Sequence, residues 1–152
     1  MDKENIKISK SILSSYFKHD FSGDDLIIEK YNQEYAALSC NSLSFRSRLA
    51  KKTPTKKGYF LTIWTKDEDN NNRPFNKEES PEFLFVIIKD ENKEGIFKFP
   101  KDVLVSKGII SDAKRGKMAF RVYPALEVGL NKTALKTQKW QVKYFEDLTT
   151  NY

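Results

Sequence analysis

The spacing of apolar and polar residues predicts strands through the middle of the chain. Residues 43–50 alternate as a half-buried strand does, so one of its faces is expected to be polar and basic. Residues 59–64 and 83–88 are apolar on both faces, which is typical of central strands covered from both sides. Two further strands are expected at 96–99 and 118–123. The apolar side of the first strand carries Leu43, Phe45 and Leu49, and its polar side carries Ser44, Arg46 and Arg48.

Other segments follow a helical spacing. We expect helices over residues 3–18 and 32–40, and Ser22 or Asp24 could cap another. Pro100 is suited to open a helix at Lys101, which Gly108 would end. The last helix is predicted over residues 132–148, with Trp140 and Tyr144 lying off its apolar face. That apolar face is formed by Ala134, Leu135, Val142, Phe145 and Leu148.

Together these elements predict an α+β fold. Helices would flank a central, mainly antiparallel sheet that could include parallel pairs. Length favours a single domain over residues 1–152, with an N-terminal helical part at 1–31, and the 39% hydrophobic content is enough to form a core. The one cysteine, Cys40, excludes an intramolecular disulfide and fits a reducing compartment. No apolar run approaches a membrane span, so we expect a cytoplasmic protein without a membrane partner.

Charge adds a candidate ligand class. The formal net charge is +6 and the pI is about 9.2, which favours anionic partners. The densest cluster lies in residues 46–57, which contain no acid and pass through a turn at 52–55. Guanidinium groups on a strand face followed by a lysine-rich turn could contact successive phosphates. Lysines at such a turn also serve solubility and protect strand edges, so this second interpretation stays open. The cations of the cluster are Arg46, Arg48, Lys51, Lys52, Lys56 and Lys57.

Two later stretches are also basic. The first of them, residues 98–121, ends at Arg121, which should share one face of its strand with Tyr123. This would place a phosphate donor beside a stacking ring, although Tyr123 could equally be core. In the last helix, Lys136 and Lys139 accompany Trp140, an arrangement suited to base stacking or to a backbone contact. The alternative is that Trp140 and Tyr144 pack against the N-terminal helices. Gln138 is expected to anchor a neighbouring backbone.

Catalytic patterns are weak. Residues 91–93 fit the short Glu-x-Lys pattern of metal-dependent nucleases, but the acids at 67–69 should lie at the opposite end of the sheet. His19 lacks a second histidine, and Cys40 lacks a plausible activating base. No glycine-rich phosphate loop is present. We therefore assign no catalytic residue, metal site or cofactor, and the sequence favours a binding protein over an enzyme.

Several motifs resemble those of the MepB family. They are the segment at 48–64, with Arg48, Lys51, Thr53-Pro54, Lys56 and Gly58, the segments at 97–100 and 120–124, and the ending at 136–141. The similar region is assigned to residues 32–148. The resemblance implies a small bacterial cytosolic protein associated with a multidrug-efflux operon, and it supplies no catalytic acid pair. The polar motif positions are Arg48, Lys51, Lys56, Arg121, Gln138 and Trp140.

These observations predict a non-catalytic nucleic-acid-binding protein whose partner is duplex DNA, held through its phosphates. A metal-dependent or degenerate nuclease and a protein-interaction module with a basic face remain as alternatives. Oligomeric state is not specified by the sequence. The residues assigned to nucleic-acid binding are Arg46, Arg48, Lys51, Lys56, Arg121, Tyr123, Lys136, Lys139 and Trp140.

Overall fold

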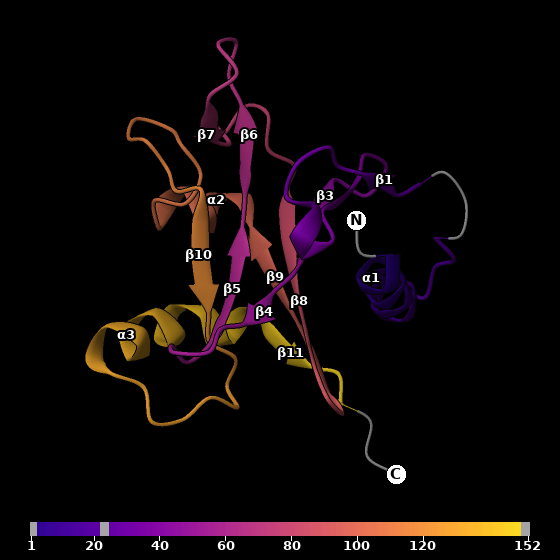
Figure 1. The fold of residues 1–152 in the computed structure, drawn as a ribbon, viewed down its shortest axis with the longest axis vertical. Helices are drawn as coiled ribbons and strands as arrows, with labels where there is room; N and C mark the ends of the chain where they lie inside the picture. Colours follow the sequence, from indigo (N-terminus) through magenta and orange to yellow (C-terminus); the bar gives the residue numbers. More distant parts are fainter. Residues whose placement is uncertain (1–2, 22–24, 150–152) are drawn as a thin grey trace.

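A six-stranded mixed sheet forms the centre of the fold (Figure 1). The computed structural model describes residues 3–21 and 25–149. Within this sheet β3 and β8 run parallel, and every other neighbouring pair is antiparallel. The α+β prediction with a mainly antiparallel sheet is thereby confirmed. In spatial order the strands are β1 (Ile27–Ile28), β2 (Leu38–Cys40), β3 (Phe45–Leu49), β8 (Phe83–Asp90), β9 (Lys93–Pro100) and β11 (Phe145–Asp147).

A second, three-stranded sheet packs against one face of the first. Its strands, in spatial order, are β10 (Ala119–Val122), β5 (Tyr59–Thr62) and β4 (Lys51–Lys52). The core between the sheets includes Leu61 and Val122 from the small sheet and Val86 and Phe97 from the large one, and all four are fully buried. Burying these side chains from water is the main force that holds the two sheets together.

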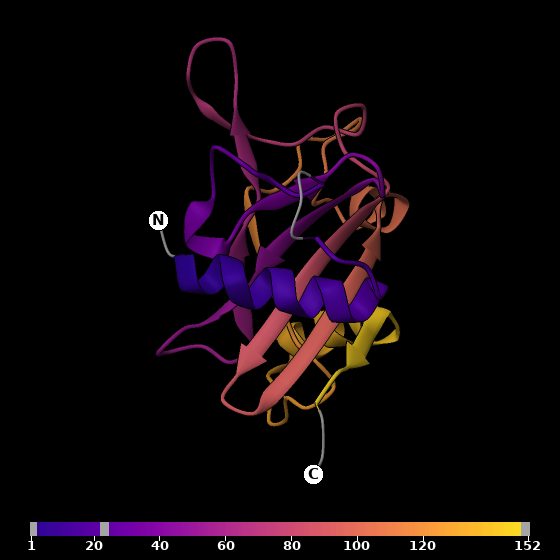
Figure 2. The ribbon, with the colours of Figure 1, turned by 90° about the vertical axis from the view of Figure 1, so that its right-hand side faces the viewer.

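Helix α1 (Lys3–Phe17) covers the other face of the large sheet, where it crosses β8 and β9 (Figure 2). It agrees with the helix predicted at 3–18. Val86 belongs to the core between the sheets, whereas the next residue, Ile87, belongs to the core under α1. Successive side chains of a strand point to opposite faces, so β8 is apolar on both sides because each side faces a separate core.

The helix predicted at 32–40 is wrong. The segment forms a single 3₁₀ turn, Gln33–Tyr35, and then strand β2. Asn32 and Ala36 on either side of the turn have left-handed backbones, with φ of 65° and 46°, which an α-helix cannot continue through. After the turn, Leu38 and Cys40 are buried while the residue between them is less so, a strand pattern.

The last predicted helix is correct only in its first part. Helix α3 (Lys132–Gln141) is followed by a 3₁₀ turn, Val142–Tyr144, and by β11, which pairs with β9. The predicted apolar face is correct only in part, because Ala134 is buried but Leu135 is 46% exposed. Trp140 turns inward instead, with its ring 5.5 Å from the buried Phe99.

The remaining elements are short. Helix α2 (Lys101–Ser106) begins directly after Pro100 and is followed by Gly108 with φ of 74°, as predicted. Strands β6 (Trp64–Lys66) and β7 (Asn72–Pro74) form a separate hairpin that projects from the body (Figures 1 and 2). The cap proposed at Ser22 or Asp24 lies outside the described residues. Among the residues that are described, no helix has the length and apolar character that crossing a membrane requires.

Candidate functional site

Arg48, a predicted phosphate contact, lies in the interior. Its side chain has no exposed surface, and its guanidinium donates two hydrogen bonds to the Glu29 carboxylate at 2.7 and 3.3 Å. Further bonds reach the carbonyl oxygens of Thr62 and Ser47. A fully buried guanidinium whose three nitrogens are all hydrogen-bonded within the protein cannot reach a phosphate, so Arg48 is corrected from a ligand contact to a structural ion pair.

Arg46 is also largely buried. Its Nε lies 3.4 Å from Glu29, one of its nitrogens donates to the Glu79 carbonyl at 3.2 Å, and its guanidinium stacks 3.7 Å from the centre of the Phe75 ring. Burial lowers the pKa of Arg46, although the Glu29 charge acts against this. The predicted basic face of β3 is therefore mostly covered by protein, because β3 is a central strand, and Arg46 keeps only 16% of its side-chain surface exposed.

The turn at 53–57, between β4 and β5, keeps its lysines in solvent. Lys56 and Lys57 are exposed. Arg121 on β10 fixes the turn, since its guanidinium donates to the Lys57 carbonyl at 3.2 Å and to the Thr53 hydroxyl at 2.8 Å. Lys57 in turn donates to the Val128 carbonyl at 2.8 Å. The turn and the loop at 124–131 thus hold each other in place.

A glycine ends this turn because no other residue fits. Gly58 has φ of 82°, and a Cβ there would lie 2.6 Å from Cε1 of Tyr123. Both the backbone conformation and the ring exclude a side chain. Of the two interpretations of Tyr123, a stacking ring or a core residue, its exposure of only 8% agrees with the second, and the turn packs against its ring.

A cleft of about 440 Å³ opens between this turn, β10 and the start of α3. Among the described residues that line it, three are cations and none is acidic. The first turn of α3 also carries no acid, so the positive end of its helix dipole is not neutralised there. We call this hollow the basic cleft. It is lined by residues 55–57, Arg121, Tyr123, residues 129–131, Thr133 and Ala134.

The basic cleft continues along α3. A second hollow of about 160 Å³ shares Arg121 and Tyr123 with it, and a third of about 310 Å³ shares Lys107 and Trp140 with the second. We call the three together the groove. Asp102 is the one acid among the described residues that line it. The lining cations are Lys56, Lys57, Lys107, Lys117, Arg121 and Lys143.

Trp140 and Tyr144 contribute aromatic surface to the groove while packing on the core. Both rings lie within 6 Å of Phe99, which corrects the alternative that they pack against the N-terminal helices. Lys107 lies 5.5 Å from the Trp140 ring centre, within cation–π range. Lys136 and Lys139 are exposed on α3 but are not among the residues that line the groove.

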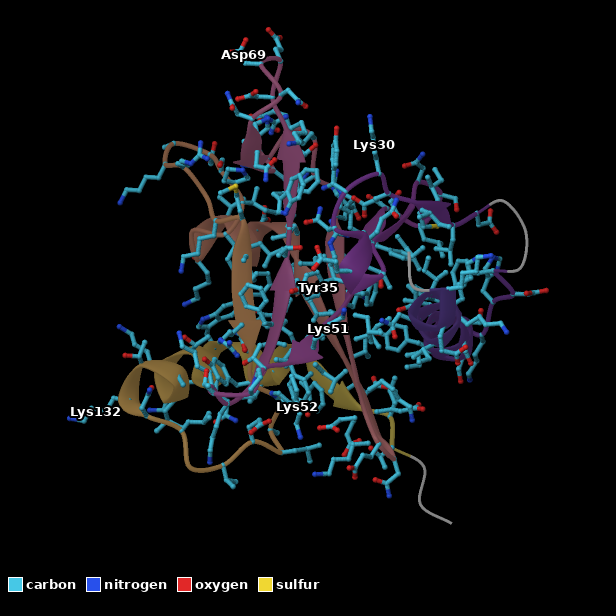
Figure 3. All side chains as sticks on the ribbon, in the orientation of Figure 1. Lys30, Tyr35, Lys51, Lys52, Asp69 and Lys132 are labelled. Carbon is cyan, nitrogen blue, oxygen red and sulfur yellow. The ribbon has the colours of Figure 1, made fainter. Side chains whose placement is uncertain are left out.

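A second arrangement lies on the outer face of the small sheet. Lys51, Phe60 and Arg121 are direct cross-strand neighbours on β4, β5 and β10. The Arg121 guanidinium carbon is 5.5 Å from the Phe60 ring centre, and Lys51 lies 5.4 Å from the ring of Tyr35 (Figure 3). We call these three residues the cross-strand row. Sequence reasoning missed Phe60 and Tyr35, because it could not show which strands are neighbours.

Two glutamines of α3 attach the helix to β10 and to the loop that follows β10. Gln141, fully buried, donates to the Arg121 carbonyl at 2.9 Å and accepts from the Tyr123 N–H at 2.8 Å, so it pairs with the edge of β10 as a strand would. Gln138 donates to the carbonyl oxygens of Pro124 and Glu127. The prediction that Gln138 anchors a neighbouring backbone is confirmed.

The acids near the Glu-x-Lys pattern lie far from the acids at 67–69. The turn that carries Glu91 and Lys93 lies at the opposite end of the molecule from the labelled Asp69 (Figures 1 and 3). Asp90 instead joins the two sheets, because it accepts hydrogen bonds from Tyr59 at 2.7 Å and from Lys52 at 2.8 Å. In the described part of the chain, no three side chains of His, Cys, Asp or Glu gather as a metal site would require.

Fold and groove together define an α+β protein with a cationic groove beside helix α3. The chain belongs to the MepB-like family, whose model matches residues 29–147. It is also similar to a crystal structure of MepB, with a TM-score of 0.83 and 49% sequence identity, covering 99% of this chain and 100% of that one. No curated protein matches.

Proposed function

We propose that this protein binds nucleic acid through its phosphates without cleaving it, and that duplex DNA is a ligand. The observation that carries the proposal is the basic cleft, where Lys56, Lys57 and Arg121 converge with no lining acid. Lysine and arginine on a concave surface attract a polyanion and release its condensed counterions. A cytoplasmic location, where nucleic acid is accessible, is part of the proposal.

The groove extends this attraction over several phosphates. Lys107, Lys117 and Lys143 follow the basic cleft along α3, so a backbone lying in the groove would meet cations in succession. Arg121 stands where the groove meets the cross-strand row. Apart from Asp102, the acids of the described residues do not line the groove, and several of them lie on the β6–β7 hairpin and in the turn after β8. This separation of charge would orient the protein on a polyanion.

Fluorescence anisotropy of a labelled duplex of about 20 base pairs tests the proposal. We expect binding at about 50 mM salt and a linear fall of the logarithm of affinity with the logarithm of salt concentration. The double variant Lys56→Ala/Lys117→Ala should weaken binding and reduce the slope by about 2, since each phosphate contact contributes about 0.9. Incubation with Mg²⁺ or Mn²⁺ should leave the duplex intact.

A matched variant controls for net charge. Lys3→Ala/Lys7→Ala also removes two exposed lysines, but from α1, on the far side of the large sheet from the small one. Its affinity and slope should stay close to those of the unaltered protein. Absence of binding by the unaltered protein at about 50 mM salt would overturn the proposal. Equal losses of affinity in both variants would show that the groove is not the binding surface.

A further inference from the structure

A pocket of about 400 Å³ lies on another side of the molecule from the groove. It opens where β2 and β3 meet the segment that precedes β8, and β1 and β3 stand well away from α3 (Figure 1). Its volume is that of pockets that hold small molecules. We call it the Arg46 pocket, because Arg46 is the one cation among the described residues that line it.

The charges around this pocket do not cancel. Glu29 and Glu79 line it, and each carboxylate is bound on both of its oxygens by another arginine. Arg48 binds Glu29 at 2.7 and 3.3 Å, and Arg73 binds Glu79 in the same two-pronged way. Arg46 is the third guanidinium of the group, with Nε 3.4 Å from Glu29 and one hydrogen bond to the Glu79 backbone carbonyl at 3.2 Å. Three arginines therefore meet two carboxylates, and one positive charge is left over.

The surplus charge is held where water screens it poorly. The Arg46 side chain is only 16% exposed, and its guanidinium carbon lies 3.7 Å from the centre of the Phe75 ring. Within the described part of the chain, Nη1 of Arg46 donates no hydrogen bond, although a guanidinium has five N–H groups to donate. A charge in such surroundings is costly to desolvate unless an anion pairs with it, so an anion in this pocket would gain more than at an exposed lysine.

The size of this surplus selects the charge of the ligand. One negative charge neutralises the group, whereas a phosphate group of charge about −1.5 to −2 would place excess negative charge beside Glu29 and Glu79. A carboxylate carries one charge, and its two oxygens match the edge of a guanidinium. The ligand group that suits Arg46 is therefore a carboxylate.

Much of the remaining pocket wall is polar and uncharged. Ser39 and Asn41 line the pocket, and no hydrogen bond of either side chain is described. The Ser44 hydroxyl accepts from the Glu82 N–H at 3.0 Å, so its own proton is available to a ligand. A few polar groups placed in this way orient a ligand that carries hydroxyl groups of its own.

We infer that the Arg46 pocket is a binding site for a small hydroxylated monocarboxylate, such as a hydroxy acid or a sugar acid, whose carboxylate pairs with Arg46 and whose hydroxyl groups bond to Ser39 and Asn41. The inference is independent of the proposed nucleic-acid binding. None of the described residues that line the Arg46 pocket also lines the groove.

Nuclear magnetic resonance titrations of the unaltered protein at constant ionic strength test the inference with three probes: lactate, its uncharged analogue lactamide, and inorganic phosphate. Lactate should shift the Arg46 Nε–H signal and the Ser39 and Asn41 amide signals saturably, with a dissociation constant in the millimolar range. Lactamide keeps the shape but not the charge, so it should bind about tenfold or more weakly, as the loss of a charge-assisted hydrogen bond provides. Phosphate should also bind more weakly than lactate. The inference is overturned if lactate causes no saturable shift, or if either other probe binds as tightly as lactate.

Variants then locate the site. Arg46→Gln should abolish the lactate-dependent shifts, whereas Arg115→Gln, which removes an exposed arginine elsewhere, should leave them unchanged. Arg46→Lys keeps the charge but loses the planar edge, so its affinity for lactate should lie between those of the unaltered protein and Arg46→Gln. Lactate binding that survives in a folded Arg46→Gln protein would overturn the inference, and if that variant does not fold, the three probes on the unaltered protein decide. A protein that binds the duplex but not lactate would lose this inference and keep the proposed function, and the opposite result would do the reverse.

Discussion

Arg48 shows that the neighbours of a residue decide whether its side chain is exposed or buried. Its place in an alternating pattern correctly predicted a strand, but alternation does not reveal whether the polar side faces water or a second layer of protein. The deciding residue is Glu29, far away in the sequence, whose carboxylate accepts two hydrogen bonds from the arginine. Lys56 and Lys57 were easier to place, because a turn with Thr-Pro between two strands stays at the surface.

The Arg48–Glu29 pair leads to the first prediction. Glu29→Gln removes the carboxylate and leaves a fully buried guanidinium without its counter-charge, which should lower the free energy of unfolding by about 3–5 kcal/mol. Urea denaturation followed by circular dichroism would measure the loss. Glu34→Gln, at an exposed position nearby, is the control and should change stability by less than about 0.5 kcal/mol. A loss below about 1 kcal/mol for Glu29→Gln would show that the pair contributes little.

At the scale of elements, long apolar strands and the first helix were predictable, and short elements were not. Strand β8 is a short apolar run rich in aromatic and β-branched residues, and this composition favours a buried strand over a buried helix. Strand β11 lies beyond the end of α3 and exists because its three residues complete the edge of the large sheet, next to β9. Nothing local distinguishes such a segment from a further helical turn, since its partner is distant in the sequence.

Helix α3 depends on one glutamine for its position against β10. Gln141→Ala would leave the Arg121 carbonyl and the Tyr123 N–H without their partner and lower the free energy of unfolding by about 2 kcal/mol. Hydrogen exchange at the Tyr123 amide should become faster at the same time. Lys139→Ala, on the exposed side of the same helix, should leave both quantities unchanged. Unchanged exchange at Tyr123 in Gln141→Ala would contradict this role.

On the scale of the whole molecule, the candidate site required tertiary structure. The three basic stretches were visible in the sequence, but their convergence was not. Residues from the turn at 53–57, from β10 and from α3 form the basic cleft, while Arg46 and Arg48 turn inward and Lys136 and Lys139 stay apart. Which residues meet depends on the pairing of β4, β5 and β10, and on the glutamines that attach α3.

The contact that joins the two sheets contains an ionisable carboxyl group, that of Asp90. Hydrogen bonds from Lys52 and then from Tyr59 lower the pKa of Asp90, while burial and the same carboxylate raise the pKa of Tyr59. Since the pKa of Asp90 is lower in the folded protein than the unfolded value of about 3.9, its stabilising contribution is present above that value and is lost as the pH falls through the folded pKa.

Asp90→Asn should therefore be less stable than the unaltered protein at pH 7, and the difference should shrink as the pH falls below about 4. Urea denaturation of both proteins at pH 7, 5, 3.5 and 2.5 would measure it. Asp112→Asn, at an exposed site for which no hydrogen bond of the side chain is described, provides the comparison. A difference that stays constant across this pH range would argue against the ionised carboxylate as its source.

The β6–β7 hairpin stands apart from both sheets and from the groove, at the other end of the molecule from α3. Its tip is self-contained, because Asp67 accepts hydrogen bonds from the N–H groups of Asp69 and Asn71. The single cysteine, Cys40, is only 1% exposed. Asp69→Cys would thus supply one reactive thiol to which a dye can be attached. Energy transfer from this dye to a labelled end of the DNA would then measure where that end lies on the protein.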